Sequence, residues 1–167
     1  PEGGAHQSVG TPLVGIGLDR LAYFEPAFVD ELGSIMAWGF RHMQEKDGGS
    51  VYLRLTTRQI DQPQREMTDA LHNDICNGGY WLKPPSPNAE LAIVYTGAVA
   101  PEAIAAHEAL LDDVPGAGLL AVTSPDRLHE NWMASRRKRE QGQAMQSHID
   151  GLLSALDPRA ALVTVLD

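Results

Sequence analysis

Residues 91–123, LAIVYTGAVAPEAIAAHEALLDDVPGAGLLAVT, decide the fold class of this chain. The apolar run Leu91–Tyr95 predicts a strand that ends in a turn at Thr96-Gly97. Pro101–Leu111 predicts a helix, and Leu119–Thr123 predicts a second strand. A strand, a helix and another strand in this order favour a parallel sheet with a right-handed crossover.

The alternation of strands and helices continues on both sides of this stretch. Downstream we expect a helix from about Pro125, a helix near Ser147–Leu156 and a strand over Ala161–Leu166. Upstream we expect a strand at Leu13–Leu18, a helix from Glu25-Pro26, a strand over Ser50–Thr57, a helix over Met67–Cys76 and a strand at Tyr80–Leu82. The helix that starts at Glu25-Pro26 has an apolar stripe at helical spacing, made of Phe28, Leu32, Ile35, Met36, Gly39 and Met43. The pattern predicts an α/β protein.

A proline-rich segment divides the chain into two parts. Three prolines stand within residues 84–88, KPPSPN being the local sequence from Lys83, and prolines favour an extended, weakly paired backbone. We therefore expect one α/β unit over residues 1–83, a linker over 84–88 and a second unit over 89–167. Each unit is predicted to contain a parallel sheet.

Composition excludes several classes of function. The 167 residues are 43% hydrophobic and carry a formal net charge of -9, spread evenly, so a nucleic-acid-binding surface is not expected. The one basic run, Arg136–Arg139, is predicted to be a solvated helix face. The only cysteine, Cys76, excludes an internal disulfide and fits a reducing compartment. No apolar run is long enough to span a bilayer and no signal peptide is evident, so we expect a cytoplasmic protein.

Two polar residues stand out as candidates for a site. His6 lies in a loop between a glycine pair and a Gly-Thr-Pro turn, where it either exchanges protons or is an inert exposed side chain. Arg58 follows the strand predicted over Ser50–Thr57, and ligands bind at the carboxyl ends of strands in open α/β sheets. Its guanidinium either binds a phosphate or carboxylate, or pairs with Glu66 or Asp61 nearby. No histidines or cysteine stand at metal-ligand spacing, so a metal site is not expected.

Four segments carry a resemblance to a known family: Glu2–Gln7, Leu55–Gln59, Asn77–Lys83 and Leu91–Gly97. Glu2–Gln7 is similar to the Asp-Gly-Pro-Thr-His-Gln loop of the transketolase superfamily, whose members use thiamine diphosphate, and the other three segments also resemble that superfamily. The resemblance covers nearly the whole chain and implies that residues 1–83 are the end of a pyrimidine-binding domain. It also implies that residues 89–167 are a truncated carboxyl-terminal domain. The chain starts without Met and ends within an expected strand, so we expect it to be a fragment of a longer polypeptide.

Within this superfamily the chain resembles most the homodimeric decarboxylating component of 2-oxo-acid dehydrogenases, such as pyruvate dehydrogenase. Thr56-Thr57, Phe24–Phe28 and Val122-Thr123-Ser124 followed by Leu128 carry that resemblance. It implies an enzyme that decarboxylates pyruvate and transfers the acyl unit to the lipoyl group of an acyltransferase component. Arg58 indicates the alternative, because the matching residue of transketolases holds the phosphate of a sugar substrate. A third hypothesis is a non-catalytic module for dimerisation or docking.

The resemblance also assigns roles to the residues of the His6 loop. His6 would hydrogen-bond the substrate oxygen that becomes an alkoxide and move its proton. Gln7 and Ser8 would position this imidazole, and Gln7 and Arg58 are the candidate substrate-binding residues. The resemblance implies thiamine diphosphate and magnesium for the intact enzyme, and we expect most of their binding residues to lie outside this chain. The isolated chain is therefore predicted to be inactive.

Overall fold

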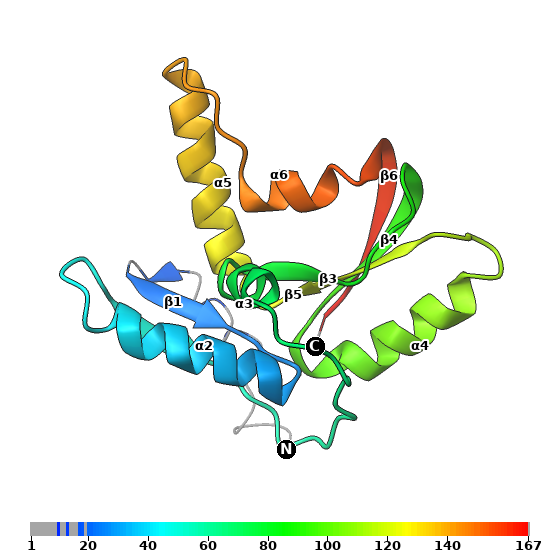
Figure 1. The fold of residues 1–167 in the computed structure, drawn as a ribbon, viewed down its shortest axis with the longest axis horizontal. Coiled ribbons are helices and arrows are strands. Elements are labelled where there is room, and N and C mark those ends of the chain that lie inside the picture. Colours follow the sequence, from blue (N-terminus) through cyan, green and yellow to red (C-terminus); the bar gives the residue numbers. More distant parts are fainter. Residues whose placement is uncertain (1–9, 11–12, 14–16, 19, 167) are drawn as a thin grey trace.

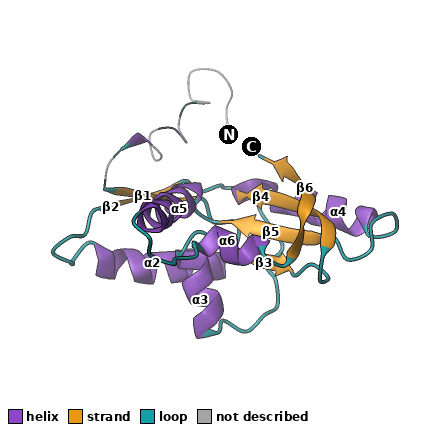
Figure 2. Cartoon of the chain, turned by 90° about the horizontal axis from the view of Figure 1, so that it is seen from above, coloured by secondary structure: helices purple, strands orange, loops and turns teal. Residues whose placement is uncertain are grey.

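The computed structural model describes residues 10, 13, 17–18 and 20–166. The strands are β1 (Leu21–Phe24), β2 (Ser50–Leu53), β3 (Gly79–Lys83), β4 (Ala89–Thr96), β5 (Gly118–Val122) and β6 (Leu156–Val165). The helices are α2 (Val29–His42), α3 (Asp69–Cys76), the 3-10 turn η2 (Gly97–Val99), α4 (Ala100–Leu110), α5 (Pro125–Glu140) and α6 (His148–Leu153). Figure 1 shows these elements along the chain, and Figure 2 shows β1 and β2 at one end of the molecule and the other four strands beside them.

Two sheets form the framework. Strands β1 and β2 pair in parallel, and the second sheet has the order β3-β5-β4-β6. Strand β4 pairs in parallel with both β5 and β6, which confirms the predicted α/β class with parallel sheets. The edge strand β3 is antiparallel to β5, a departure from an all-parallel sheet. Because β3 pairs on one side only, its direction does not affect the pairing of the parallel strands.

The strand and helix starts follow local chemistry. Helix α5 begins at Pro125 after Ser124, whose hydroxyl accepts a hydrogen bond from the Arg127 N–H. Thr68 caps α3 and Ser147 caps α6 in the same way. Strand β2 ends at Leu53, four residues before the strand end predicted at Thr57.

One strand was missed and one prediction cannot be compared. Strand β1 (Leu21–Phe24) precedes Glu25-Pro26, where the sequence predicts only the beginning of a helix. Its Tyr23 and Phe24 side chains are fully buried. The predicted strand at Leu13–Leu18 falls largely outside the described residues.

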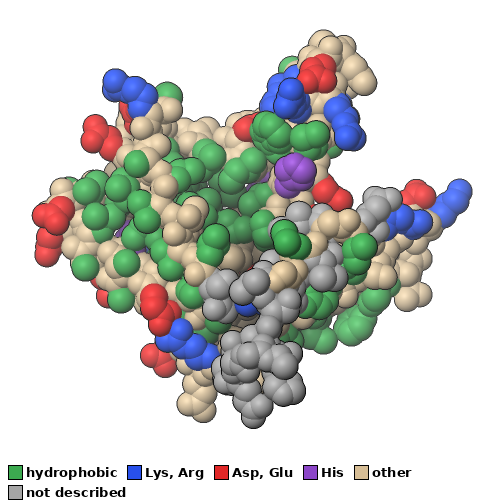
Figure 3. Space-filling view, turned by 180° about the vertical axis from the view of Figure 1, so that it is seen from behind, with side chains coloured by type: hydrophobic (Ala, Val, Ile, Leu, Met, Phe, Trp, Pro, Cys, Tyr) green, Lys and Arg blue, Asp and Glu red, His purple; other side chains and the backbone are tan. Residues whose placement is uncertain are grey.

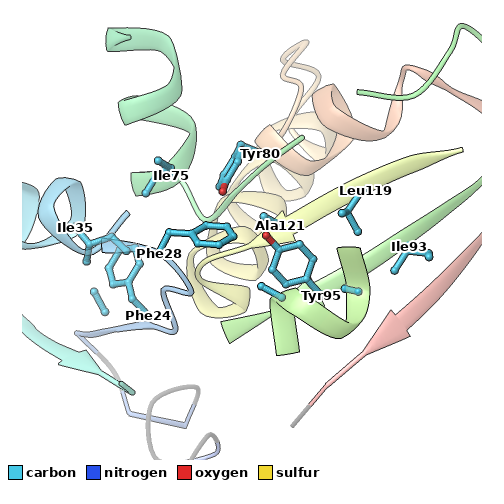
Figure 4. Packing of buried hydrophobic residues seen from close by; sticks show 12 residues of the cluster. Phe24, Phe28, Ile35, Ile75, Tyr80, Ile93, Tyr95, Leu119 and Ala121 are labelled. Atoms are coloured by element: carbon cyan, nitrogen blue, oxygen red, sulfur yellow. The ribbon is translucent and has the colours of Figure 1, made fainter. Parts of the chain in front are cut away.

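The core joins the two sheets. A single cluster of buried side chains contains Phe24, Phe28 and Ile35 together with Tyr80 and Tyr95 of the second sheet, and Figure 4 shows these rings packed between α2 and the strands. The predicted stripe on α2 is correct for Phe28, Ile35 and Gly39. It is wrong for Met36 and Met43, which are exposed.

The same packing bears on the position of the proline-rich segment. Strand β3 precedes residues 84–88, yet it pairs with β5, which follows them. The core cluster likewise draws on residues from both sides of this segment. Residues on the two sides of the proline-rich segment thus pack together, and the division into domains over residues 1–83 and 89–167 stays a prediction.

Helix α5 projects from the remainder of the molecule (Figure 1). Its basic residues Arg136–Arg139 are exposed, as predicted, with Arg136 paired to Glu140 and Arg139 to Asp150. Figure 3 shows Lys and Arg side chains gathered on a projection of the molecule, away from the broad hydrophobic area on the same face. Within the described part of the chain, no helix combines the length and apolar character needed to cross a bilayer.

Candidate functional site

The carboxyl ends of β1, β2 and β4 meet at one place. The backbone N–H of Arg54, just after β2, donates to the carbonyl of Phe24 at the end of β1 (2.9 Å). Directly after β4, Gly97 lies so close to Glu25 that a Cβ added there would stand 3.1 Å from a carboxylate oxygen. Gly97 has a φ of +63°, which favours glycine, and the turn it makes brings β4 against Glu25. Ligands of open α/β sheets bind at such strand ends, so these residues form the candidate site.

An ion pair between buried Glu25 and partly buried Arg54 lies at this site. The Glu25 side chain is 5% exposed, and one Arg54 terminal nitrogen lies 2.8 Å from its Oε2. A buried carboxylate without a partner would be costly, and the Arg54 guanidinium supplies that partner. The pair links the end of β1 to the start of the loop that follows β2.

Arg58 lies in the loop after β2, and its guanidinium is bound by residues of this chain. Its two terminal nitrogens lie 2.9 and 2.6 Å from the two Glu102 carboxylate oxygens, a bidentate pair. One of these nitrogens also donates to the Ala98 carbonyl at 3.2 Å. Both side chains are about half exposed, so water reaches the pair and weakens it.

The charges of this pair shift each other's titration. The hydrogen bonds and charge of Glu102 raise the pKa of Arg58, and the hydrogen bond from Arg58 lowers the pKa of Glu102. Both groups are therefore charged at neutral pH. An incoming anion has to compete with the Glu102 carboxylate for the Arg58 guanidinium.

The loop that carries Arg58 is fixed at its far end. Arg65 makes two bonds to Asp30 at the start of α2, at 2.7 and 2.8 Å, and donates to the Tyr80 hydroxyl at 2.8 Å. Tyr80 in turn donates to Glu31 at 2.6 Å, and Glu31 also accepts from the backbone N–H of Phe28. This cluster of buried Glu31 and Tyr80 with partly buried Asp30 and Arg65 ties the loop to α2 and β3.

Burial raises the pKa of two members of that cluster, Glu31 and Tyr80. Desolvation raises the pKa of Glu31, which the hydrogen bonds from Tyr80 and from the Phe28 and Ala27 backbone partly oppose. Burial also raises the pKa of Tyr80, so the phenol stays protonated and donates. The cluster contains charges that are satisfied within the protein, and it lies behind the Arg58 loop as a structural support.

The structure places only part of the predicted site. His6, Gln7 and Ser8 lie outside the described residues, and their roles stay predictions. The expected pairing of Arg58 with Glu66 or Asp61 is wrong, because its partner is Glu102, 44 residues away in sequence. Glu25 and Glu102 were both missed. The available signal for Glu102 was its place in the first turn of the predicted helix Pro101–Leu111, directly after a strand end.

The described residues do not offer a place for the implied magnesium. No three of the His, Cys, Asp and Glu side chains within the described part of the chain gather closely enough to hold a metal ion. The carboxylates at the candidate site are engaged by Arg54 and Arg58. No catalytic step through magnesium or thiamine diphosphate is derived from these residues.

Comparison with known proteins identifies the fold. Neither protein-family models nor curated proteins match the sequence. Among solved structures, a mutant transketolase from Pichia stipitis matches 96% of this chain with a TM-score of 0.65 at 20% identity. A transketolase from Leishmania mexicana matches 96% with a TM-score of 0.69 at 15% identity. A split-gene transketolase, an inactive beta4 tetramer, matches 97% with a TM-score of 0.58 at 17% identity.

The coverage of those proteins is unequal. The chain spans 20% of the length of the Pichia stipitis and Leishmania mexicana proteins and 43% of the split-gene protein. The match extends along almost the entire length of this chain, across both sheets. The chain therefore has the fold of one segment of a transketolase.

Proposed function

We propose that this chain is a segment of a thiamine-diphosphate-dependent enzyme that decarboxylates a 2-oxo acid. The fold of a transketolase segment supports the enzyme superfamily, and the resemblance of Phe24–Phe28 and Thr56-Thr57 to pyruvate dehydrogenase supports the reaction. When bound, thiamine diphosphate supplies the electron sink for loss of carbon dioxide. The described residues contribute the strand-end framework on which substrate groups are placed.

The observation that carries the choice of substrate is the state of Arg58. Its guanidinium is engaged by both oxygens of Glu102 and by the Ala98 carbonyl. An arginine satisfied in this way has a structural role and is not needed for a substrate without a phosphate. Pyruvate and related 2-oxo acids are such substrates.

The second candidate is a transketolase acting on sugar phosphates. Two of the matched Pichia stipitis structures are complexes with fructose 6-phosphate and sedoheptulose 7-phosphate, which favours this alternative. The Arg58–Glu102 pair is half exposed, and exposed pairs contribute little, so a phosphate dianion could displace the carboxylate. Arg58 would then bind the phosphate in bidentate fashion.

Two variants of the full-length polypeptide separate these functions, assayed with thiamine diphosphate and magnesium. For a 2-oxo-acid enzyme, Arg58→Ala and Glu102→Ala both leave the KM for pyruvate within about twofold, because neither residue contacts substrate. For a transketolase, Arg58→Ala raises the KM for the sugar phosphate about tenfold or more. Glu102→Ala lowers that KM, since it frees the guanidinium. Opposite effects of the two variants would refute our choice of substrate.

The role of His6 needs its own variant. We propose that its imidazole hydrogen-bonds the reacting oxygen of the substrate, and Gln7 and Ser8 position it. His6→Ala should lower turnover about a hundredfold while the affinity for thiamine diphosphate changes little. Unchanged turnover would refute this assignment, whichever substrate the enzyme uses.

A further inference from the structure

A polar cavity lies at the amino ends of the strands of the two-stranded sheet, opposite the carboxyl ends that carry the candidate site. It has a volume of about 200 Å³ and is bounded by the amino end of β1, the residue before β2, the end of α2 and the first turns of α5. The ionisable side chains that line it are Arg20, His42, Asp47, Arg127 and Glu130. Since β1 and β2 run in parallel, this cavity faces away from the strand ends that carry Arg54 and Arg58 (Figure 1). It is therefore distinct from the candidate site described above.

Arg127 lines this cavity and is held by its Nε and its ring contacts, not by its terminal nitrogens. Its Nε donates to the Cys76 carbonyl at 2.6 Å, and its guanidinium carbon lies 4.3 Å from the centre of the Trp38 ring. These contacts fix the plane of the guanidinium. Within the described part of the chain, no acceptor is hydrogen-bonded to its two terminal nitrogens. Two parallel donors on a fixed plane match the geometry of a carboxylate or a phosphate.

The surroundings of Arg127 increase its attraction for an anion. The side chain is half buried, and desolvation lowers its pKa, so its charge is less well solvated than that of a surface arginine. Glu130, one turn further along α5, is the counter-charge that opposes this shift most strongly. Removal of the Glu130 charge should therefore strengthen the attraction for an external anion.

The other walls of the cavity are held in place by the backbone. The Gly49 N–H donates to His42 Nε2 at 3.1 Å, which leaves the proton of a neutral imidazole on Nδ1. Arg20 donates to the Gly48 carbonyl and has a φ of 61°. A side chain at Gly49 would collide with the Arg20 carbonyl, so this wall depends on glycine. The cavity is formed by contacts that do not need a ligand.

From these observations we propose that Arg127 binds the oxyanion group of a small ligand in this cavity. The shared chemistry is a carboxylate or phosphate oxygen pair that accepts from the two terminal nitrogens of Arg127. The volume is below the range of about 300–1,000 Å³ typical of sites for drug-sized ligands, so the ligand is a small metabolite or a free anion. Arg20 lies at the edge of the same cavity and adds a second positive charge.

Calorimetric titration of the full chain tests this proposal, with inorganic phosphate in one arm and acetate in the other. Both are run against chloride at equal ionic strength, which separates specific binding from screening. We expect saturable binding of at least one of the two anions, and the tighter arm identifies the oxyanion. Arg127→Gln should weaken binding about tenfold or more, whereas Glu130→Gln should tighten it.

A matched control is Arg136→Gln, which removes an exposed arginine of the same helix, and this variant should leave the affinity unchanged. If Arg127→Gln fails to fold, the Glu130→Gln result decides the matter. Absence of saturable binding by either anion to the unmodified chain, or no tightening by Glu130→Gln, would overturn the proposal.

Discussion

Removal of one hydroxyl from the buried cluster tests how the Arg58 loop is supported. The Tyr80 hydroxyl donates to Glu31 at 2.6 Å and accepts from Arg65 at 2.8 Å, and the side chain is 2% exposed. Tyr80→Phe removes both bonds, each of which involves a charged partner. Hydrogen bonds to charged groups contribute about 1.5–3 kcal/mol each, but Glu31 and Arg65 keep other partners. We therefore expect a loss of about 2–4 kcal/mol in the free energy of unfolding.

Tyr23→Phe is the matched control. Tyr23 is fully buried as well, but its hydroxyl has no hydrogen-bond partner among the described residues. Removing an unpaired buried hydroxyl should leave stability unchanged or raise it by up to about 1 kcal/mol. The two variants make the same chemical change at two buried rings, and only one hydroxyl belongs to the cluster.

Urea denaturation followed by tryptophan fluorescence gives both values. With a slope of about 2 kcal/mol per molar urea, Tyr80→Phe should lower the midpoint by about 1–2 M, and Tyr23→Phe should not lower it. The corresponding loss in Tm is about 5–15 °C for a chain of this length. If the two variants unfold at the same urea concentration, the cluster does not stabilise the fold in the way described here.

Three further predictions follow from single residues. Burial raises the pKa of Glu31 above its value in the unfolded chain. The contribution of this shift to the free energy of unfolding is therefore complete below the unfolded pKa and is lost as pH rises through the folded pKa. Urea denaturation at pH 4 to 8 should show the wild type losing stability with rising pH relative to Glu31→Gln. Gly33→Ala, on the exposed face of α2 with nothing near its Cβ, should stabilise by about 0.5–1 kcal/mol, whereas Gly39→Ala, which meets Val51 at 3.3 Å, should not; a thermal melt that ranks them in reverse would contradict this packing. Burial raises the pKa of the Cys76 thiol, so a thiol reagent should label it slowly in the native chain and rapidly in urea.

Much of the second sheet could be predicted from periodicity. The runs Leu91–Tyr95 and Leu119–Val122 are continuously apolar because β4 and β5 lie in the middle of a sheet. Turn residues mark both of their ends. The direction of β3 could not be predicted, since no local signal distinguishes an antiparallel edge strand from a parallel one.

The first sheet was harder to predict because its elements are short. Strand β1 has four residues and runs directly into Glu25-Pro26, so its pattern merges with the expected helix start. The predicted stripe on α2 included Met36 and Met43 as core residues. Both are exposed, because no other described part of the chain covers them. Sequence periodicity predicts which face of a helix is apolar, but it does not predict how much of that face neighbouring elements cover.

The candidate site shows the same limit. Arg58 was found because it follows a strand, a local feature. Its partner Glu102 could not be found, because only the packing of the two sheets brings the loop after β2 to the first turn of α4. Glu25 gave no signal, since its burial depends on Arg54 and on the approach of Gly97. Side chains that depend on long-range packing stay hidden in the sequence.

Product analysis of the full-length polypeptide tests the proposed reaction most directly. The protein is incubated with thiamine diphosphate and magnesium, once with pyruvate and an artificial electron acceptor and once with a ketose phosphate and an aldose phosphate. We expect release of carbon dioxide from pyruvate with reduction of the acceptor, and no ketol transfer. Ketol transfer without decarboxylation of pyruvate would contradict the proposed function and would assign Arg58 to the substrate phosphate.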